Sequence, residues 1–140
     1  MGEKLVRILA WVGVVILQLI MSQVTTFLAS LLFPGMEKIQ QTSSALFAAI
    51  LAFTFTLGIF LVGWLAIKWH WLKEKPMALS RLGGTLLGAI LPLIIALIIY
   101  PSLEPGNPFF FISILVSILG FHLPGWVMRG NKNGTKQIVL

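Results

Sequence analysis

Four long runs of apolar residues without a charged side chain dominate the sequence. The first, from Ile8 to Phe33, has 26 residues, and about 20 are enough for an α-helix to cross the hydrocarbon core of a bilayer. The other three runs are 44–67, 82–100 and 109–127. Inside hydrocarbon each backbone amide needs a partner in the protein, and a helix supplies that partner within its own segment. The sequence therefore predicts an all-α membrane protein with four transmembrane helices.

The composition indicates that most of the chain is surrounded by lipid and not by water. Of the 140 residues, 58% are hydrophobic and 10% are charged, whereas a soluble domain carries about 25% charged residues. The apolar runs also lack the alternation that the strands of a membrane barrel would show. At this length we expect a single integral membrane domain, 1–140. Because the chain has no cysteine, disulfides, iron–sulfur clusters, thiolate zinc sites and cysteine nucleophiles are excluded.

Two short loops join the apolar runs in pairs. The loop at 34–42 opens with proline and glycine, and the loop at 101–108 contains three prolines and one glycine, a composition that opposes regular structure. Short loops make consecutive helices antiparallel neighbours, so we expect two membrane hairpins. A side-chain oxygen can accept from a free backbone N–H at a helix start, and three residues are candidates for this role before the second helix: Thr42, Ser43 and Ser44.

The segment 68–81, which links the two hairpins, is the only long interior segment that is densely charged. Pro76 breaks any helix there, and residues 77–81 are expected to form a short interfacial turn. Together with both termini, this connector carries nine of the ten Lys and Arg residues, Arg81 among them, and Lys38 alone lies on the opposite side. The positive-inside rule then places both termini and the connector in the cytoplasm. We expect a bacterial plasma membrane and a mobile tail, 128–140.

The basic excess and the tryptophans both fit this orientation. The net charge is +6, and cations near the cytoplasmic surface attract anionic lipids. Tryptophan suits the headgroup level, and all five lie at or near the predicted cytoplasmic ends of the spans: Trp11, Trp64, Trp69, Trp71 and Trp126. No run of five or six like charges exists, so a nucleic-acid partner is not expected. The expected partners are the lipid bilayer, anionic lipids at the cytoplasmic face, and other membrane subunits or further copies of this chain.

The sequence offers few groups for catalysis or ion coupling. Its four acidic residues, Glu3, Glu37, Glu74 and Glu104, all lie outside the predicted spans, and we expect no lysine or arginine at depth. Carriers that couple transport to protons or sodium usually need an ionisable group inside the membrane. The sequence therefore argues against a coupled transporter, and it contains no catalytic pair.

The first span is the most polar of the four. Four of its residues recur at spacings of four, three and four, which places them on one face of a helix: Gln18, Ser22, Thr25 (or Thr26) and Ala29. Gln23 lies about 100° away from this stripe. One interpretation is hydrogen bonding between helices. The other is a polar path, a pore or substrate groove, which Pro92 would shape by bending the third span.

Small residues mark faces where two helices can approach closely. In the third span Gly84 and Gly88 form a GxxxG pattern, which lets two helix backbones come into contact. The fourth span has a similar face made of Ser113, Ser117 and Gly120. We expect these residues to pack against other helices, either in the same chain or in a second copy.

Two histidines, His70 and His122, are the candidates for ligand binding. Both are expected near the cytoplasmic side, so a shared site is an open alternative. A haem or metal site needs two or more ligands that face one another. We therefore expect interfacial imidazoles bonded to carbonyl oxygens, with no cofactor and no metal.

These features predict a role without catalysis. We expect a small non-enzymatic integral membrane protein that acts as a subunit or scaffold of a membrane complex or of a homo-oligomer. The alternative is a small channel or uncoupled carrier with its polar path along the first helix. A membrane enzyme, the third interpretation, would have to depend on His122 or His70.

Overall fold

The computed structural model describes residues 2–72, 77–100 and 107–134, with side chains up to residue 127. These ranges contain five α-helices and no strand: α1 (Gly2–Leu32), α2 (Met36–Thr42), α3 (Ser44–Lys68), α4 (Ala78–Ile99) and α5 (Pro108–Gly134). Four of them are long and apolar enough to cross a membrane, namely α1, α3, α4 and the part of α5 at Pro108–Val127. The prediction of an all-α chain with four long apolar helices is therefore confirmed for the described residues.

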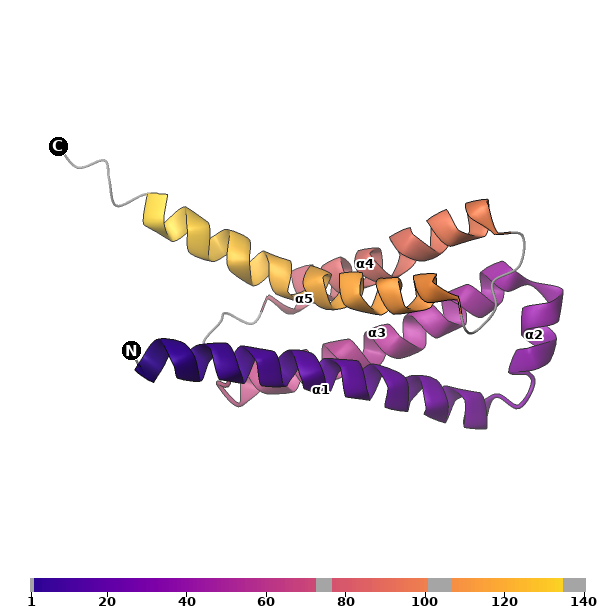
Figure 1. Cartoon of the computed structure of the whole chain (residues 1–140), viewed down its shortest axis with the longest axis horizontal. Coiled ribbons are helices and arrows are strands. Elements are labelled where there is room, and N and C mark those ends of the chain that lie inside the picture. Colours follow the sequence, from indigo (N-terminus) through magenta and orange to yellow (C-terminus); the bar gives the residue numbers. More distant parts are fainter. Residues whose placement is uncertain (1, 73–76, 101–106, 135–140) are drawn as a thin grey trace.

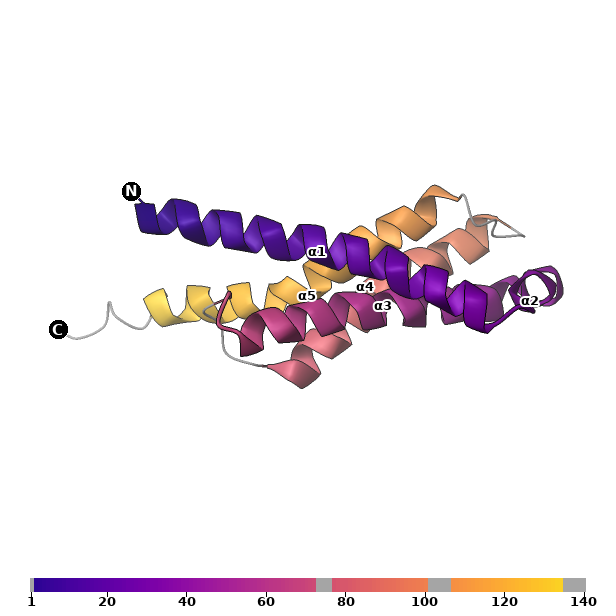
Figure 2. The ribbon, with the colours of Figure 1, turned by 90° about the horizontal axis from the view of Figure 1, so that it is seen from below.

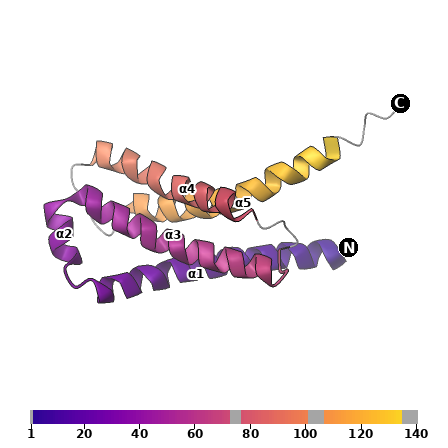
Figure 3. The same ribbon diagram turned by 180° about the vertical axis from the view of Figure 1, so that it is seen from behind.

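The four long helices lie along the long axis of the molecule, and α2 lies across one end, between α1 and α3 (Figure 1). The chain runs back and forth, so the start of α1 and the end of α5 lie at the same end of the molecule. The largest contacts join α4 to α5 and α1 to α3. Helix α3 lies between α1 and α4, as the reverse view shows (Figure 3). By contrast, α1 contacts α5 only lightly, and its N-terminal half diverges from the other helices (Figure 2).

Helix α3 forms the centre of the core. Its sequence is apolar around the whole circumference, which suits a helix surrounded by others. Half of its most apolar stretch is buried inside the protein, compared with 17% for α1. The most enclosed apolar side chains include Phe55 and Ile59 of α3 and Phe121 of α5. Lipid is as apolar as these side chains, so close packing and hydrogen bonds must supply most of the association between the helices.

Three segments outside the predicted spans are helical. Residues 2–7 extend α1, since no proline interrupts them and Glu3 in the first turn suits the helix dipole. Residues 36–42, predicted to be a polar loop, form α2, whose Met36 is buried in the core. At the other end α5 continues to Gly134, beyond the predicted end of the span at 127.

Polar residues cap two of the helix starts. Ser43, one of the three candidates, caps α3, because its hydroxyl oxygen accepts from the backbone N–H of Leu46 at 3.3 Å. Asn107 caps α5 in the same way, with its Oδ1 3.0 Å from the backbone N of Phe109. Pro108 then occupies the first helical position, where its missing N–H leaves no bond unmade. The predicted irregular loop therefore ends at 107, and its residues 101–106 lie outside the described residues.

The structure describes the basic connector only at its two ends. Residues 73–76, which include Pro76, lie outside the described residues. The segment 77–81 was predicted to be an interfacial turn, but α4 already begins at Ala78. No glycine or proline lies between 77 and 82, so nothing prevents the helix from starting directly after Pro76.

Candidate functional site

Gln18 lies at the centre of the buried polar groups. Its side chain is fully buried, and its Nε2 donates to the backbone oxygen of Ile59 in α3 at 3.1 Å. Its Oε1 lies 3.0 Å from His122 Nε2 in α5. A carbonyl oxygen can only accept, so the amide N–H₂ must face α3, and the imidazole nitrogen that faces Oε1 must carry a hydrogen. One amide thus joins α1, α3 and α5.

Aromatic rings enclose the His122 imidazole. The ring is fully buried, its centroid lies 5.4 Å from that of Trp11 in an edge-to-face arrangement, and the Trp126 ring is stacked on it at 6.4 Å. From the sequence we expected an interfacial imidazole bonded to a carbonyl oxygen. The partner of Nε2 is the side-chain carbonyl oxygen of Gln18, and a single sequence does not reveal this pairing because the two residues are 104 positions apart.

Arg81, which the sequence assigns to the basic connector, is buried within the protein. Only 1% of its surface is exposed. Its Nη1 donates to the backbone oxygen of Phe121 at 3.1 Å, and its guanidinium carbon lies 5.0 Å from the centre of the Phe121 ring. Counting charges placed Arg81 with the surface cations of the connector, but a long side chain on the first turn of α4 can fold inward along α5. Its contact with an aromatic face is a cation–π arrangement.

The polar contacts continue along the interface between α4 and α5. The Thr85 hydroxyl donates to the backbone oxygen of Arg81 at 2.6 Å, and the Ser117 hydroxyl donates to the backbone oxygen of Thr85 at 2.6 Å. Both side chains are fully buried. Ser113, one turn before Ser117, is equally buried, and its hydroxyl has no hydrogen-bond partner among the described residues. Ser117 therefore links the two helices directly, whereas Ser113 contributes its small size.

Glycines bring α4 and α5 into backbone contact. A Cβ added at Gly88 would lie 2.5 Å from the backbone oxygen of Val116, and one added at Gly84 would collide with the backbone oxygen of Gly120. A Cβ at Gly120 would collide with Gly84 in turn. Gly84 and Gly120 are thus placed against each other, and Gly88 is placed against Val116. The three glycines singled out in the sequence therefore make their close contacts within one chain.

A second close approach, between α1 and α3, was missed in the sequence. A Cβ on Gly58 would lie 2.6 Å from the backbone oxygen of Met21. Gly63, also in α3, faces the Phe121 ring, which occupies the space that a side chain would fill. The two glycines are five residues apart, so they form no GxxxG pattern, and their presence inside an apolar run was the only available signal.

The residues of the predicted polar path are placed in contacts between or within helices. Gln18 and Ser22 are fully buried, and the Ser22 hydroxyl donates to the backbone oxygen of Leu19 at 2.7 Å. Thr25 donates to the backbone oxygen of Met21 at 2.9 Å. Pro92 is buried inside α4, which continues through it to Ile99. The donors of these side chains are thus engaged by protein oxygens.

His70 ends α3 and is not brought together with His122. Its φ is 60°, a left-handed conformation that favours glycine but occurs for histidine. The N–H of Trp71 bonds the Ala66 oxygen at 2.9 Å and that of His70 bonds the Ile67 oxygen at 3.0 Å, the pair of bonds of a Schellman helix end. The His70 side chain is exposed. The described residues contain no group of three or more His, Asp or Glu that could hold a metal ion.

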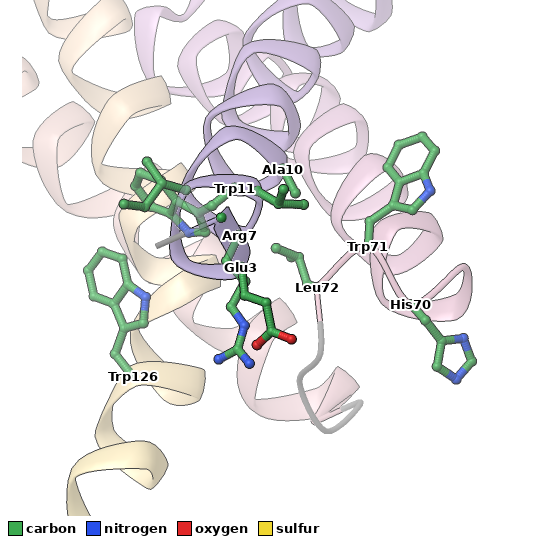
Figure 4. Close-up of a pocket in the computed structure, with 11 residues that line it drawn as sticks. Glu3, Arg7, Ala10, Trp11, His70, Trp71, Leu72 and Trp126 are labelled. Atoms are coloured by element: carbon green, nitrogen blue, oxygen red, sulfur yellow. The ribbon is translucent and has the colours of Figure 1, made fainter.

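A groove of about 1020 Å³ opens at the end of the molecule where α1 starts and α3 ends. In Figure 4, Glu3 and Arg7 extend from the first turns of α1, with Trp126 on one side and Leu72 and Trp71 on the other. Trp11 also lines this groove and contacts His122. The groove therefore combines aromatic walls with one cation and one anion, next to the buried imidazole.

A second groove, of about 470 Å³, lies between α1 and α5 near α2; we call it the α1–α5 groove. Its polar lining on α1 consists of Gln23, Thr26 and Ser30, and its apolar lining includes Phe55 and Phe111. The side chains of Gln18, Arg81 and Ser117, by contrast, connect helices to one another. In comparisons with protein-family models, curated proteins and solved structures, the chain matched none.

Proposed function

We propose that the chain is a small non-enzymatic integral membrane protein that serves as a subunit or scaffold of a membrane complex or of a homo-oligomer. The observation that carries this proposal is the use of the polar side chains inside the four long helices. Gln18, Arg81 and Ser117 are engaged in contacts that hold helices together, while α1 keeps most of its surface uncovered. A protein of this kind has a specific interior and an outer face that is available to a partner.

The interior supports the proposal because two of its buried polar side chains bond from one helix to another. Gln18 bridges α1, α3 and α5, and Ser117 bridges α5 and α4. A polar group in hydrocarbon without a partner is costly, and hydrogen bonds between membrane helices contribute about 0.6 kcal/mol each on average. These contacts select one arrangement of the four helices. The donors of Gln18 and Ser117 already bond protein oxygens, so they are not free to bind a passing solute. The alternative of a polar path along these side chains therefore has less support.

The surface of α1 supports a partner outside the chain. Only 17% of its most apolar stretch is buried, against 33% to 50% for the corresponding stretches of the other three long helices. It packs mainly on α3. A helix on the edge of a bundle can face lipid along its whole outer side when that side is apolar, but the outer side of α1 also carries Gln23 and Ser30. These two side chains favour contact with protein.

The proposed topology is two membrane hairpins with both termini and the connector in the cytoplasm of a bacterial-type plasma membrane. It is supported by the nine-to-one distribution of Lys and Arg and by the common end at which α1 starts and α5 finishes. The tryptophan-lined groove lies at that same end. Anionic lipids are the proposed partners there, because Lys4, Arg7 and Lys68 are exposed at that end and cations near the surface attract their headgroups.

Purification in a mild detergent tests the subunit or scaffold role. The full-length chain would be extracted from its native membrane, and native mass spectrometry would give the masses of the intact particles. We expect an assembly of defined stoichiometry, either of copies of this chain or of this chain with other membrane proteins. A monomer that passes solute across liposome membranes would contradict the proposal and would favour the channel or carrier.

A further inference from the structure

Gln23 is an exposed amide deep in a membrane-spanning helix. It lies nine residues before Leu32, the last residue of α1, which corresponds to roughly 14 Å along a helix that rises 1.5 Å per residue. The hydrocarbon core is about 30 Å thick, so Gln23 lies near its middle when α1 ends at the membrane surface. The side chain is exposed, and the amide makes no hydrogen bond to the other described residues. Such an amide needs a partner that the described chain does not supply.

Two hydroxyl residues continue this polar strip toward the end of α1. Thr26 and Ser30 lie within about 60° of Gln23 on the helix surface, and all three line the α1–α5 groove. Their hydroxyls donate to backbone oxygens of α1 itself, Thr26 to Ser22 at 2.8 Å and Ser30 to Phe27 at 2.7 Å. Each hydroxyl oxygen therefore still has a lone pair that can accept a bond from outside. The strip offers donors at Gln23 and acceptors at all three positions.

We propose that a second copy of this chain lays its α1 helix along the α1–α5 groove, so that the two Gln23 amides bond to each other across a two-fold axis. This inference rests on the proposed function and names the partner and the surface. The axis would be parallel to the membrane normal, because all copies of a membrane protein insert in the same orientation. The two α1 helices then run parallel, and equivalent residues of the two copies lie at the same depth in the membrane.

The chemistry of the strip favours a second copy over an unrelated helix. An amide has both a donor and an acceptor, so it is complementary to itself, and a two-fold contact brings each residue opposite its own equivalent. An unrelated helix would need a matching polar group at the same depth. The loose contact of α1 with α5 leaves room on this side, and the apolar wall formed by Phe55, Phe111 and Ile114 can receive the apolar side chains of the second α1.

Cross-linking in membranes tests the pairing, and the absence of native cysteine makes the test clean. Gln23→Cys and the control Leu28→Cys would each be expressed in the full-length chain and treated with a short bismaleimide. Leu28 is 49% exposed but lies about 140° around the helix from Gln23. We expect dimers from Gln23→Cys and almost none from Leu28→Cys. Equal cross-linking of both variants, or none at Gln23→Cys, would overturn the proposal.

A second measurement separates the amide contact from mere proximity. Gln23→Leu should raise the dimer dissociation constant in detergent by about three- to tenfold, the loss expected for one or two hydrogen bonds between membrane helices, and Gln23→Asn should retain part of the affinity. An unchanged constant for Gln23→Leu would refute the amide pairing. Rapid labelling of Gln23→Cys by a membrane-impermeant thiol reagent, without cross-linking, would identify the groove as a hydrated vestibule and also refute it. If the pairing fails but the chain forms a stoichiometric complex with other proteins, the proposed function still holds. If the chain is monomeric, both the pairing and the proposed function are refuted.

Discussion

Gln18 can hold three helices together because one short planar group presents donors on one side and an acceptor on the other. Its N–H₂ bonds the Ile59 oxygen, and its oxygen faces His122. Arg81 acts in a comparable way on α5, where it contacts both the backbone oxygen and the ring of Phe121. Phe121 and His122 are neighbours in the chain, so the two sets of contacts meet on a single turn of α5.

The exchange Gln18→Leu tests the Gln18 contacts at the scale of one residue. It keeps the volume approximately but removes both interhelical contacts and leaves the His122 Nε2 hydrogen without its acceptor. We expect the variant to lose about 1–3 kcal/mol of unfolding free energy, measured by denaturation in detergent micelles. Thr54→Val is the matched control, because the Thr54 hydroxyl bonds only the Leu51 oxygen of its own helix, at 2.9 Å. A Gln18→Leu variant as stable as Thr54→Val would show that the amide does not hold the helices.

Helix α4 packs against α5 more extensively than any other pair of helices, and small residues on both allow it. The approach is close enough that Gly84 and Gly120 contact each other through backbone atoms. Gly83 is adjacent in sequence but faces open space, with nothing within 4 Å of an added Cβ. Gly84 thus lies in the tight contact with α5, whereas Gly83, the residue before it, lies on the free face of α4.

The pair Gly88→Ala and Gly83→Ala tests this packing at the scale of an element. An added methyl at position 88 would lie 2.5 Å from the Val116 oxygen, so α4 and α5 would have to separate, at a cost typical of overpacking, about 1–3 kcal/mol. At position 83 the methyl meets nothing, and alanine favours the helix by up to about 1 kcal/mol. Thermal unfolding followed by circular dichroism should show a lower Tm for Gly88→Ala and an equal or higher Tm for Gly83→Ala. The reverse order would mean that Gly88 does not face α5.

At this scale the sequence predicts the helices well and their mutual contacts only in part. The lengths of the apolar runs are sufficient to identify α1, α3, α4 and α5, because the bilayer fixes the length of a span. The early start of α4 and the short α2 were missed, since polar residues at the ends of spans form helix or loop with little difference in local preference. The burial of Arg81 was missed because it depends on a partner 40 residues away.

We propose that the whole molecule consists of two hairpins, which are joined by buried polar contacts. The exposed cations Lys4, Arg7 and Lys68 lie toward the end where α1 starts, as do the tryptophans that line the larger groove. From the sequence, the number of long apolar helices and the bias of charge could be predicted, because both depend only on composition along the chain. Which side chains meet inside, such as Gln18 and His122, could not, because that depends on how the helices are rotated about their axes.

Labelling of single cysteines in intact cells tests the proposed architecture most directly. Glu3 lies at the start of α1 and Gln41 lies in α2, and both side chains are exposed. With a thiol reagent that cannot cross the membrane, Gln41→Cys should be labelled in intact cells and Glu3→Cys only after lysis. The same test at Ser102 and Asn131 should label Ser102→Cys in intact cells and Asn131→Cys only after lysis. Labelling of Glu3→Cys and Asn131→Cys on opposite sides of the membrane would require an odd number of crossings and would contradict the two-hairpin architecture.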